Sequence, residues 1–312
     1  MKADLHLHSC YSNDGEKSIP QIIRMCMEHQ VQVFSITDHN GTRGASQAAR
    51  HCAGEKSLRF IPGIEIDCNF RGTDLHVLGY QVDAEDPVFE ALEKEVEKKF
   101  LDATPEMLEN LGKLGIEIEL EELMERSGGK APTGEQMAEL LLENPELHAH
   151  PRLKPYFPGG HRSDMPLINF YLDFLAQGKP AHVEIRHMDF QEAVDLVINA
   201  GGIPIVAHPG LNLKGREGLV KELVMQGARG LEVFNNYHSA QQTAYFADLV
   251  RKKGALMTCG SDYHGNTKPL IAVGQYRMLD EFRPDLDQSL SYIRDYRSVP
   301  SSGRGHPPPS AL

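Results

Sequence analysis

The 312-residue sequence predicts an α/β fold, a closed barrel of strands that is interrupted by an inserted helical domain. Short apolar segments alternate with helical segments at both ends of the chain, whereas the middle is poor in Val and Ile and rich in Glu. Six segments, most of them apolar, end in a histidine or a carboxylate. A barrel of parallel strands gathers side chains from such strand ends onto one face.

The first part of the barrel is expected over residues 1–83. Ser18 is placed to cap a helix that has Pro20 in its first turn. Pro62 and Gly63 are expected to bend the third strand. The expected strands are 2–8, 31–37, 58–66 and 74–82. One helix is expected to begin after Ser18, and a second is expected to span 44–52.

The inserted domain is expected over residues 84–178, which contain 20 acidic and 9 basic side chains and so carry nearly all of the net charge of −12. Such an acidic module repels a long phosphate backbone and favours a small substrate or the end of a short oligonucleotide. Its expected helices span residues 89–100, 105–114, 119–126, 135–142 and 167–176.

The barrel pattern resumes over residues 179–297, which gives about seven strands in total. A tail over 298–312, rich in Ser, Pro and Gly, is expected to be disordered. The expected strands are 202–207, 230–234 and 255–259, and the expected helices are 189–200, 216–226 and 240–253.

Composition narrows the class of protein further. Five widely spaced cysteines argue against a disulfide framework and against a thiolate zinc site. The sequence contains neither an apolar run of membrane-spanning length nor a signal peptide, so we expect a cytoplasmic protein without a membrane association. Nothing in the sequence indicates an obligate protein partner.

His6 and His8 are two residues apart on a predicted strand and therefore face the same side. Together with the other strand ends and the loop residue Asp14 they form a set that suits two or three zinc, manganese or iron ions. Burying so many polar groups without a cation would be costly. The nine candidate ligands are His6, His8, Asp14, His39, Glu65, His76, His208, Asp262 and His264.

The motifs that contain these residues resemble the PHP family, named for polymerase-associated and histidinol-phosphatase domains. They are Asp4-Leu5-His6-Leu7-His8-Ser9, Thr37-Asp38-His39, Pro62-Gly63-Ile64-Glu65, Leu75-His76-Val77-Leu78-Gly79-Tyr80, Ala207-His208-Pro209 and Gly260-Ser261-Asp262-Tyr263-His264-Gly265. The resemblance implies a distorted seven-stranded β/α barrel holding up to three metal ions. The helical insertion is similar to that of the nucleotide phosphatase and 5′-3′ exonuclease branch.

One motif departs from that branch, because the loop after His8 is one residue longer than the branch usually has. Asp14 is the favoured ligand, and Asn13 is the alternative that would weaken the ion bound there. Asp4 and Asp38 precede ligands and are expected to accept hydrogen bonds that orient imidazoles.

The cation cluster favours hydrolysis of a phosphate monoester. Three divalent ions, three carboxylates and a hydroxide sum to about +2, which balances a phosphate dianion. The expected reaction is in-line attack of metal-held hydroxide on phosphorus, without a phospho-enzyme. Arg162, Lys179, Arg186 and His238 are the candidate substrate contacts, and Arg162 is one that the resemblance suggests.

The expected substrate is a small nucleotide, either a nucleoside monophosphate or a 3′,5′-bisphosphate. The alternatives are a 5′-3′ exonuclease acting on short single-stranded RNA or DNA ends, a histidinol-phosphate phosphatase, and a non-catalytic metal-binding accessory module. Stacking on Tyr156, Phe157, Phe170 or Tyr171 would favour the oligonucleotide. A C–N hydrolase of the amidohydrolase type is disfavoured because no predicted strand ends in a bridging lysine.

Overall fold

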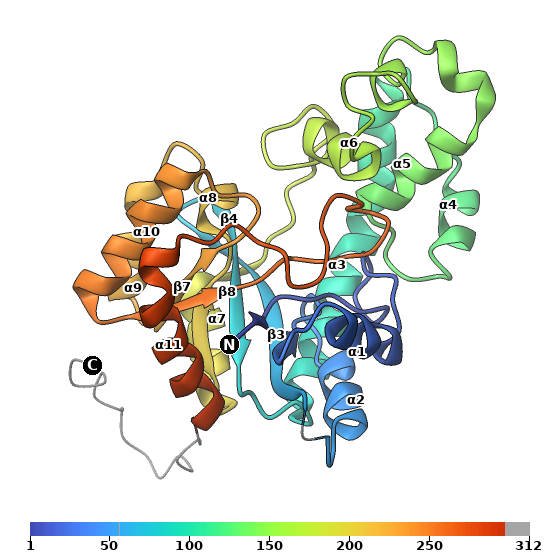
Figure 1. Cartoon of the computed structure of the whole chain (residues 1–312). Helices are drawn as coiled ribbons and strands as arrows, with labels where there is room; N and C mark the ends of the chain where they lie inside the picture. Colours follow the sequence, from blue (N-terminus) through green and yellow to red (C-terminus); the bar gives the residue numbers. More distant parts are fainter. Residues whose placement is uncertain (56, 297–312) are drawn as a thin grey trace.

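The computed structural model describes residues 1–55 and 57–296 and shows a nearly closed barrel of seven strands (Figure 1). Along the sheet the strands follow the order β1-β2-β3-β4-β6-β7-β8, and β5 pairs with the outer part of β3. The strands are β1 (Ala3–Asp4), β2 (Val33–Ile36), β3 (Arg59–Phe70), β4 (Thr73–Tyr80), β5 (Met188–Asp189), β6 (Ile203–Val206), β7 (Gly230–Phe234) and β8 (Leu256–Cys259).

Hydrogen bonds between the first strand and the segment after β8 draw the two ends of the sheet together. The Leu5 amide donates to the Cys259 carbonyl at 3.0 Å, and the Asp262 amide donates to the His6 carbonyl at 3.0 Å. The His8 amide donates to Tyr263 at the same distance. The predicted seven-stranded barrel is therefore confirmed, and its two ends bring residues 6–8 beside residues 262–264.

The expectation that all strands run parallel is wrong for β4, which is antiparallel to both β3 and β6. Arg71 and Gly72 connect β3 to β4 with φ values of 51° and 73°, and so short a turn can only join antiparallel strands. β3 also continues to Phe70, beyond the expected end. Its pairing with β2 ends at Pro62 and its pairing with β4 begins at Gly63, where a bend was expected.

Helices pack around the barrel and cover a core of Val, Ile, Leu and Phe side chains. One begins at the expected cap, where Ser18 forms a capping box with Gln21, and another begins after Ser239, which forms a capping box with Gln242. These helices are α1 (Ile19–Glu28), α2 (Arg43–His51), α7 (Phe190–Asn199), α8 (Pro209–Asn212), α9 (Val220–Met225), α10 (Ala240–Lys253) and α11 (Arg283–Asp295), with short 3₁₀ turns at Glu217–Leu219 and Asp280–Phe282.

Between β4 and β5 the chain forms a helical lobe that stands above the barrel (Figure 1). It has its own apolar cluster, in which Leu111, Leu123 and Phe170 are fully buried. The division of the chain at residues 84 and 178 remains a prediction. The lobe contains α3 (Pro87–Gly112), α4 (Leu120–Arg126), α5 (Gly134–Glu143), α6 (Pro166–Phe174) and 3₁₀ turns at Pro145–Ala149 and Lys154–Tyr156.

α3 is one helix where two were expected, because it continues through Pro105. Its first half buries Phe89 and Leu92 in the barrel core, and its second half buries Met107 and Leu111 in the lobe. Packing at both ends outweighs the single backbone hydrogen bond that a proline removes. The helix thus connects the lobe to the barrel.

No helix among the described residues is long and apolar enough to cross a membrane. The tail that was expected to be disordered lies outside the described residues.

Candidate metal centre

The structure brings all nine predicted ligands to one end of the barrel. His6 and His8 follow β1, His39 follows β2, and His208 follows β6. Glu65 and His76 lie within the paired strands β3 and β4. Their side chains fall into overlapping groups of nitrogen and oxygen atoms that lie within 4.8 Å of one another.

The first group consists of His6, His8, Glu65 and Asp262 and is completely buried. The Nε2 atoms of the two histidines lie 3.0 Å and 3.1 Å from Glu65 Oε2. The same nitrogens lie 3.2 Å and 3.3 Å from Asp262 Oδ1. Two imidazole nitrogens and two carboxylate oxygens at this spacing suit a four-coordinate divalent cation.

The second group shares Glu65 with the first. Glu65 Oε1 lies 2.8 Å from His76 Nδ1 and 3.0 Å from His208 Nε2. Because its other oxygen faces His6 and His8, the Glu65 carboxylate is placed to bridge two cations.

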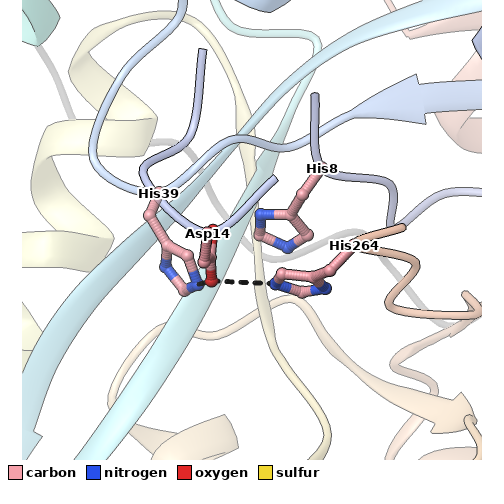
Figure 2. Close-up of side chains that lie close together, drawn as sticks. All are labelled: His8, Asp14, His39 and His264. Atoms are coloured by element: carbon pink, nitrogen blue, oxygen red, sulfur yellow. Dashed lines mark ion pairs between the residues drawn. The ribbon is translucent and has the colours of Figure 1, made fainter. Parts of the chain in front are cut away.

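The third group contains His8, Asp14, His39 and His264 (Figure 2). Asp14 Oδ2 lies 3.0 Å from His264 Nε2 and 3.5 Å from His39 Nε2. The neighbouring Asn13 is exposed, so the longer loop delivers the aspartate and not the asparagine. His8 stacks on His264 with 3.9 Å between ring centroids and thereby joins this group to the first.

The donor set fits divalent cations. His8 Nδ1 and His264 Nε2 are buried and have no hydrogen-bond partner among the described residues. The His264 nitrogen faces Asp14 at 3.0 Å without hydrogen-bond geometry. A buried nitrogen without a hydrogen-bond partner is costly in a metal-free protein, and one that faces a carboxylate, as in His264, is ordinary in a metal site.

The clustered histidines and carboxylates shift one another's pKa values. Burial alone would raise the pKa of Glu65, but His6, His76 and His39 hold it well below its usual value. Burial alone would lower the pKa of His6, but Glu65, Glu232 and Asp262 raise it well above its usual value. Burial and the neighbouring His264 lower the pKa of His8. The carboxylates are thus ionised and available as ligands.

Asp262 has a strained backbone and a tightly fixed side chain. Its φ of 59° is unusual for a buried residue other than glycine, and such strain is concentrated at functional sites. Oδ2 accepts hydrogen bonds from Lys268 Nζ at 2.7 Å and from the Tyr237 hydroxyl at 2.6 Å. These two donors leave Oδ1 facing His6 and His8.

Lys268 and Tyr237 were not among the predicted site residues, and neither were two acidic residues beside the ligands. Glu232 on β7 is fully buried and accepts a hydrogen bond from His6 Nδ1 at 3.0 Å. Asp67 lies two residues after Glu65 on the same strand and approaches His39 and His76. A carboxylate within an apolar strand was the available signal for both.

Asp4 and Asp38 were expected to orient imidazoles, but the structure gives them other partners. Asp38 accepts hydrogen bonds from the Ser9 amide and hydroxyl at 2.6 Å and 2.7 Å. Asp4 accepts from the Ser261 amide and hydroxyl and from the Gly274 amide. Burial raises the pKa of Asp4 to about 6 although these hydrogen bonds oppose the rise. Both carboxylates thus hold backbone segments that carry ligands.

The four candidate substrate contacts lie in different surroundings. Arg162 forms a bidentate pair with Asp173 at 2.8 Å and 3.0 Å in the lobe. Lys179 is exposed, and Arg186 is exposed beside a cavity of about 210 Å³ that Asp67 also lines. His238 is buried, its Nδ1 donates to the Val233 carbonyl, and its Nε2 accepts from the Gly210 amide. The contacts of these four residues with a substrate remain predictions.

Comparison with known proteins assigns the family. The model of the PHP domain matches residues 4–145. A phosphoribosyl 1,2-cyclic phosphate 1,2-diphosphodiesterase of Eggerthella lenta is 30% identical over 277 residues, which cover 88% of this chain and 98% of the relative. The chain belongs to the PHP family. The family resemblance read from the sequence is thereby confirmed.

Two further relatives of this PHP protein also act on phosphate esters. A 3′,5′-nucleoside bisphosphate phosphatase of Chromobacterium violaceum is 26% identical, with 84% of this chain and 86% of the relative covered. The 5′-3′ exoribonuclease Rnm of Escherichia coli is 27% identical, with 87% and 88% covered. The expected class, a metal-dependent phosphoesterase, is confirmed at the level of the family.

Solved structures share the fold of this PHP protein. An amidohydrolase from Chromobacterium violaceum, with bound sulfate and no metal, superposes with a TM-score of 0.73 at 24% identity and covers 93% of this chain and 97% of its own. A structure from Bifidobacterium adolescentis superposes with a TM-score of 0.70 at 21% identity and covers 91% and 95%.

Proposed function

We propose that this PHP protein hydrolyses the phosphate monoester of a small nucleotide, a nucleoside monophosphate or a 3′,5′-bisphosphate, with two or three divalent cations as cofactors. The observation that carries the proposal is the convergence of three ligand groups, of which the first shares Glu65 with the second and His8 with the third. Manganese, zinc and iron all suit this mixture of imidazole and carboxylate. At such a centre cations act as Lewis acids and supply an activated water.

The side chains of the protein would prepare the site for this chemistry. His6, His8, Glu65 and Asp262 would hold one cation, and Glu65, His76 and His208 would hold another. Asp14, His39 and His264 would hold a third. Because the first group is buried, the local dielectric is low, which would strengthen the attraction between the cation held there and a phosphate.

The lobe supports a small substrate over a long nucleic acid. Of the four aromatic residues considered for stacking, Tyr156, Phe157 and Phe170 are buried in the core of the lobe. Tyr171 is partly buried against the same core. A stacking platform for several bases requires exposed rings, so these residues favour a substrate with at most one base near the lobe.

The 30% identity to a cyclic phosphate diphosphodiesterase makes a small cyclic phosphodiester the second candidate substrate. The decisive test is phosphate release by manganese-loaded protein from mononucleotides, 3′,5′-bisphosphates, ribose cyclic phosphates, histidinol phosphate and 5′-phosphorylated oligomers. We expect the highest kcat/KM on a small nucleotide. His8→Ala and Asp262→Ala should abolish that activity, and activity that survives both would belong to a contaminant. Failure to release phosphate from any of these compounds would refute the proposal.

A further inference from the structure

Asp67 stands between two of the ligand groups without belonging to the predicted ligands. It lies on β3 two residues after Glu65, so both side chains point to the same face of the strand. Asp67 Oδ1 lies 3.2 Å from His39 Nδ1 and 3.4 Å from His76 Nε2. The two rings meet edge to face with centroids 5.1 Å apart, so a single oxygen reaches both.

In each ring it is the outer nitrogen that faces Asp67. The other nitrogen of His39, Nε2, faces Asp14 Oδ2 at 3.5 Å and Glu65 Oε2 at 3.6 Å. The other nitrogen of His76, Nδ1, faces Glu65 Oε1 at 2.8 Å. An imidazole that ligates a metal through one nitrogen carries its proton on the other, where it can donate to a carboxylate.

Asn40 fixes the Asp67 carboxylate from the opposite side. Its amide nitrogen donates to Asp67 Oδ2 at 2.8 Å, and its amide oxygen accepts from the Asp67 backbone amide at 3.0 Å. These reciprocal bonds hold the carboxylate plane and leave Oδ1 directed at the two histidines. Asp67 Oδ1 and His39 Nδ1 meet at ion-pair distance without hydrogen-bond geometry, and neither atom has a hydrogen-bond partner among the described residues.

We infer that Asp67 is a positioning residue that sets the tautomers of His39 and His76 together and thereby couples the second and third cation sites. The inference rests on the ligand roles proposed above. Replacing Asp67 should weaken both of those sites and spare the cation held by His6, His8, Glu65 and Asp262. Loss of one outer carboxylate from a metal-bound histidine typically reduces metal affinity by about 10–100-fold.

The test measures metal retention independently of activity. Wild type, Asp67→Asn, Asp67→Glu and the control Asp74→Asn are loaded with manganese and titrated with a chelator, and bound metal is counted by mass spectrometry. Asp74 lies on the neighbouring strand, and its carboxylate accepts from Asn69, so the control removes a nearby charge without touching a ligand. We expect Asp67→Asn to release all but one cation at chelator concentrations about 10–100-fold lower, and Asp67→Glu to restore part of the affinity.

Equal retention by Asp67→Asn and wild type would overturn the inference, whereas a wild type that binds no cation would refute the proposed function instead. A measurement on wild type guards against a variant that does not fold. In ¹⁵N-histidine spectra of the zinc-loaded protein, we expect the proton of His39 on Nδ1 and that of His76 on Nε2. The opposite tautomer at both rings would contradict the role of Asp67.

Discussion

Glu232→Gln probes the buried carboxylate that connects two ligand-bearing segments. Glu232 Oε1 accepts from His6 Nδ1 at 3.0 Å, and Oε2 accepts from the His208 backbone amide at 2.8 Å. A glutamine at this position has one accepting oxygen, so its NH₂ group must face one of the two donors. One buried donor then loses its partner.

The size of the effect follows from these two contacts. Leaving a buried donor unpaired costs roughly 1–3 kcal/mol. Loss of the carboxylate behind His6 should weaken cation binding by about 10–100-fold, which corresponds to about 1.4–2.8 kcal/mol. The two values agree in magnitude, and we expect kcat/KM to fall with metal occupancy.

The assay combines a chelator titration of manganese-loaded protein with kcat/KM at low and saturating manganese. Excess metal should restore much of the activity, because Glu232→Gln acts through His6. Glu281→Gln, an exposed acid outside the site, serves as the matched control and should behave as wild type. Manganese affinity equal to wild type in Glu232→Gln would refute the reasoning.

Three further variants test neighbouring parts of the site. In Gly260→Ala the added methyl group would lie 2.2 Å from His6 Cβ and 2.6 Å from Glu232 Oε1. We therefore expect the free energy of unfolding, measured by thermal denaturation, to fall by roughly 1–3 kcal/mol and the metal content to fall with it. A variant with normal stability and metal content would argue against this packing. Lys268→Met removes a donor to Asp262 Oδ2 and should lower kcat/KM by about tenfold or more; unchanged kinetics would show that this contact is dispensable. Burial, reinforced by Asp14, raises the pKa of Glu135 from 4.5 to about 7. Ionisation of Glu135 therefore lowers the free energy of unfolding of the metal-free protein as the pH rises through this range. Glu135→Gln should therefore gain stability relative to wild type between pH 5 and 8, by at most about 3 kcal/mol in denaturant titrations, and a constant difference across that range would contradict the shift.

Strand ends were the part of the site that the sequence alone could predict. His6, His39 and His208 each follow a short apolar strand, and the carboxyl ends of parallel strands meet at one end of a barrel. Their convergence therefore required no knowledge of the exact strand order.

The supporting contacts could not be predicted because they depend on which strands are neighbours. Glu232 reaches His6 only because β7 lies beside β8 and the segment after β8 pairs with residues 5–8. Asp67 reaches His76 because β4 folds back on β3 as an antiparallel hairpin. A pattern of alternating strands and helices indicated a parallel sheet and concealed this contact.

Local propensity also failed where packing outweighed it. Pro105 indicated a break between two helices, yet α3 runs through it because both of its ends are buried in apolar clusters. The long loop at Asn13 and Asp14 left two ligand choices open, and only the path of the loop in three dimensions shows which side chain faces His264.

The central claim is that three groups of side chains at one barrel end hold cations, with Glu65 shared by the first and second groups and His8 shared by the first and third. Anomalous diffraction from manganese-loaded crystals tests it most directly. We predict peaks within about 2.0–2.3 Å of ligand atoms of His6, His76 and His264, with both Glu65 oxygens in contact with metal. Peaks absent from these positions, or found only on the protein surface, would contradict the account.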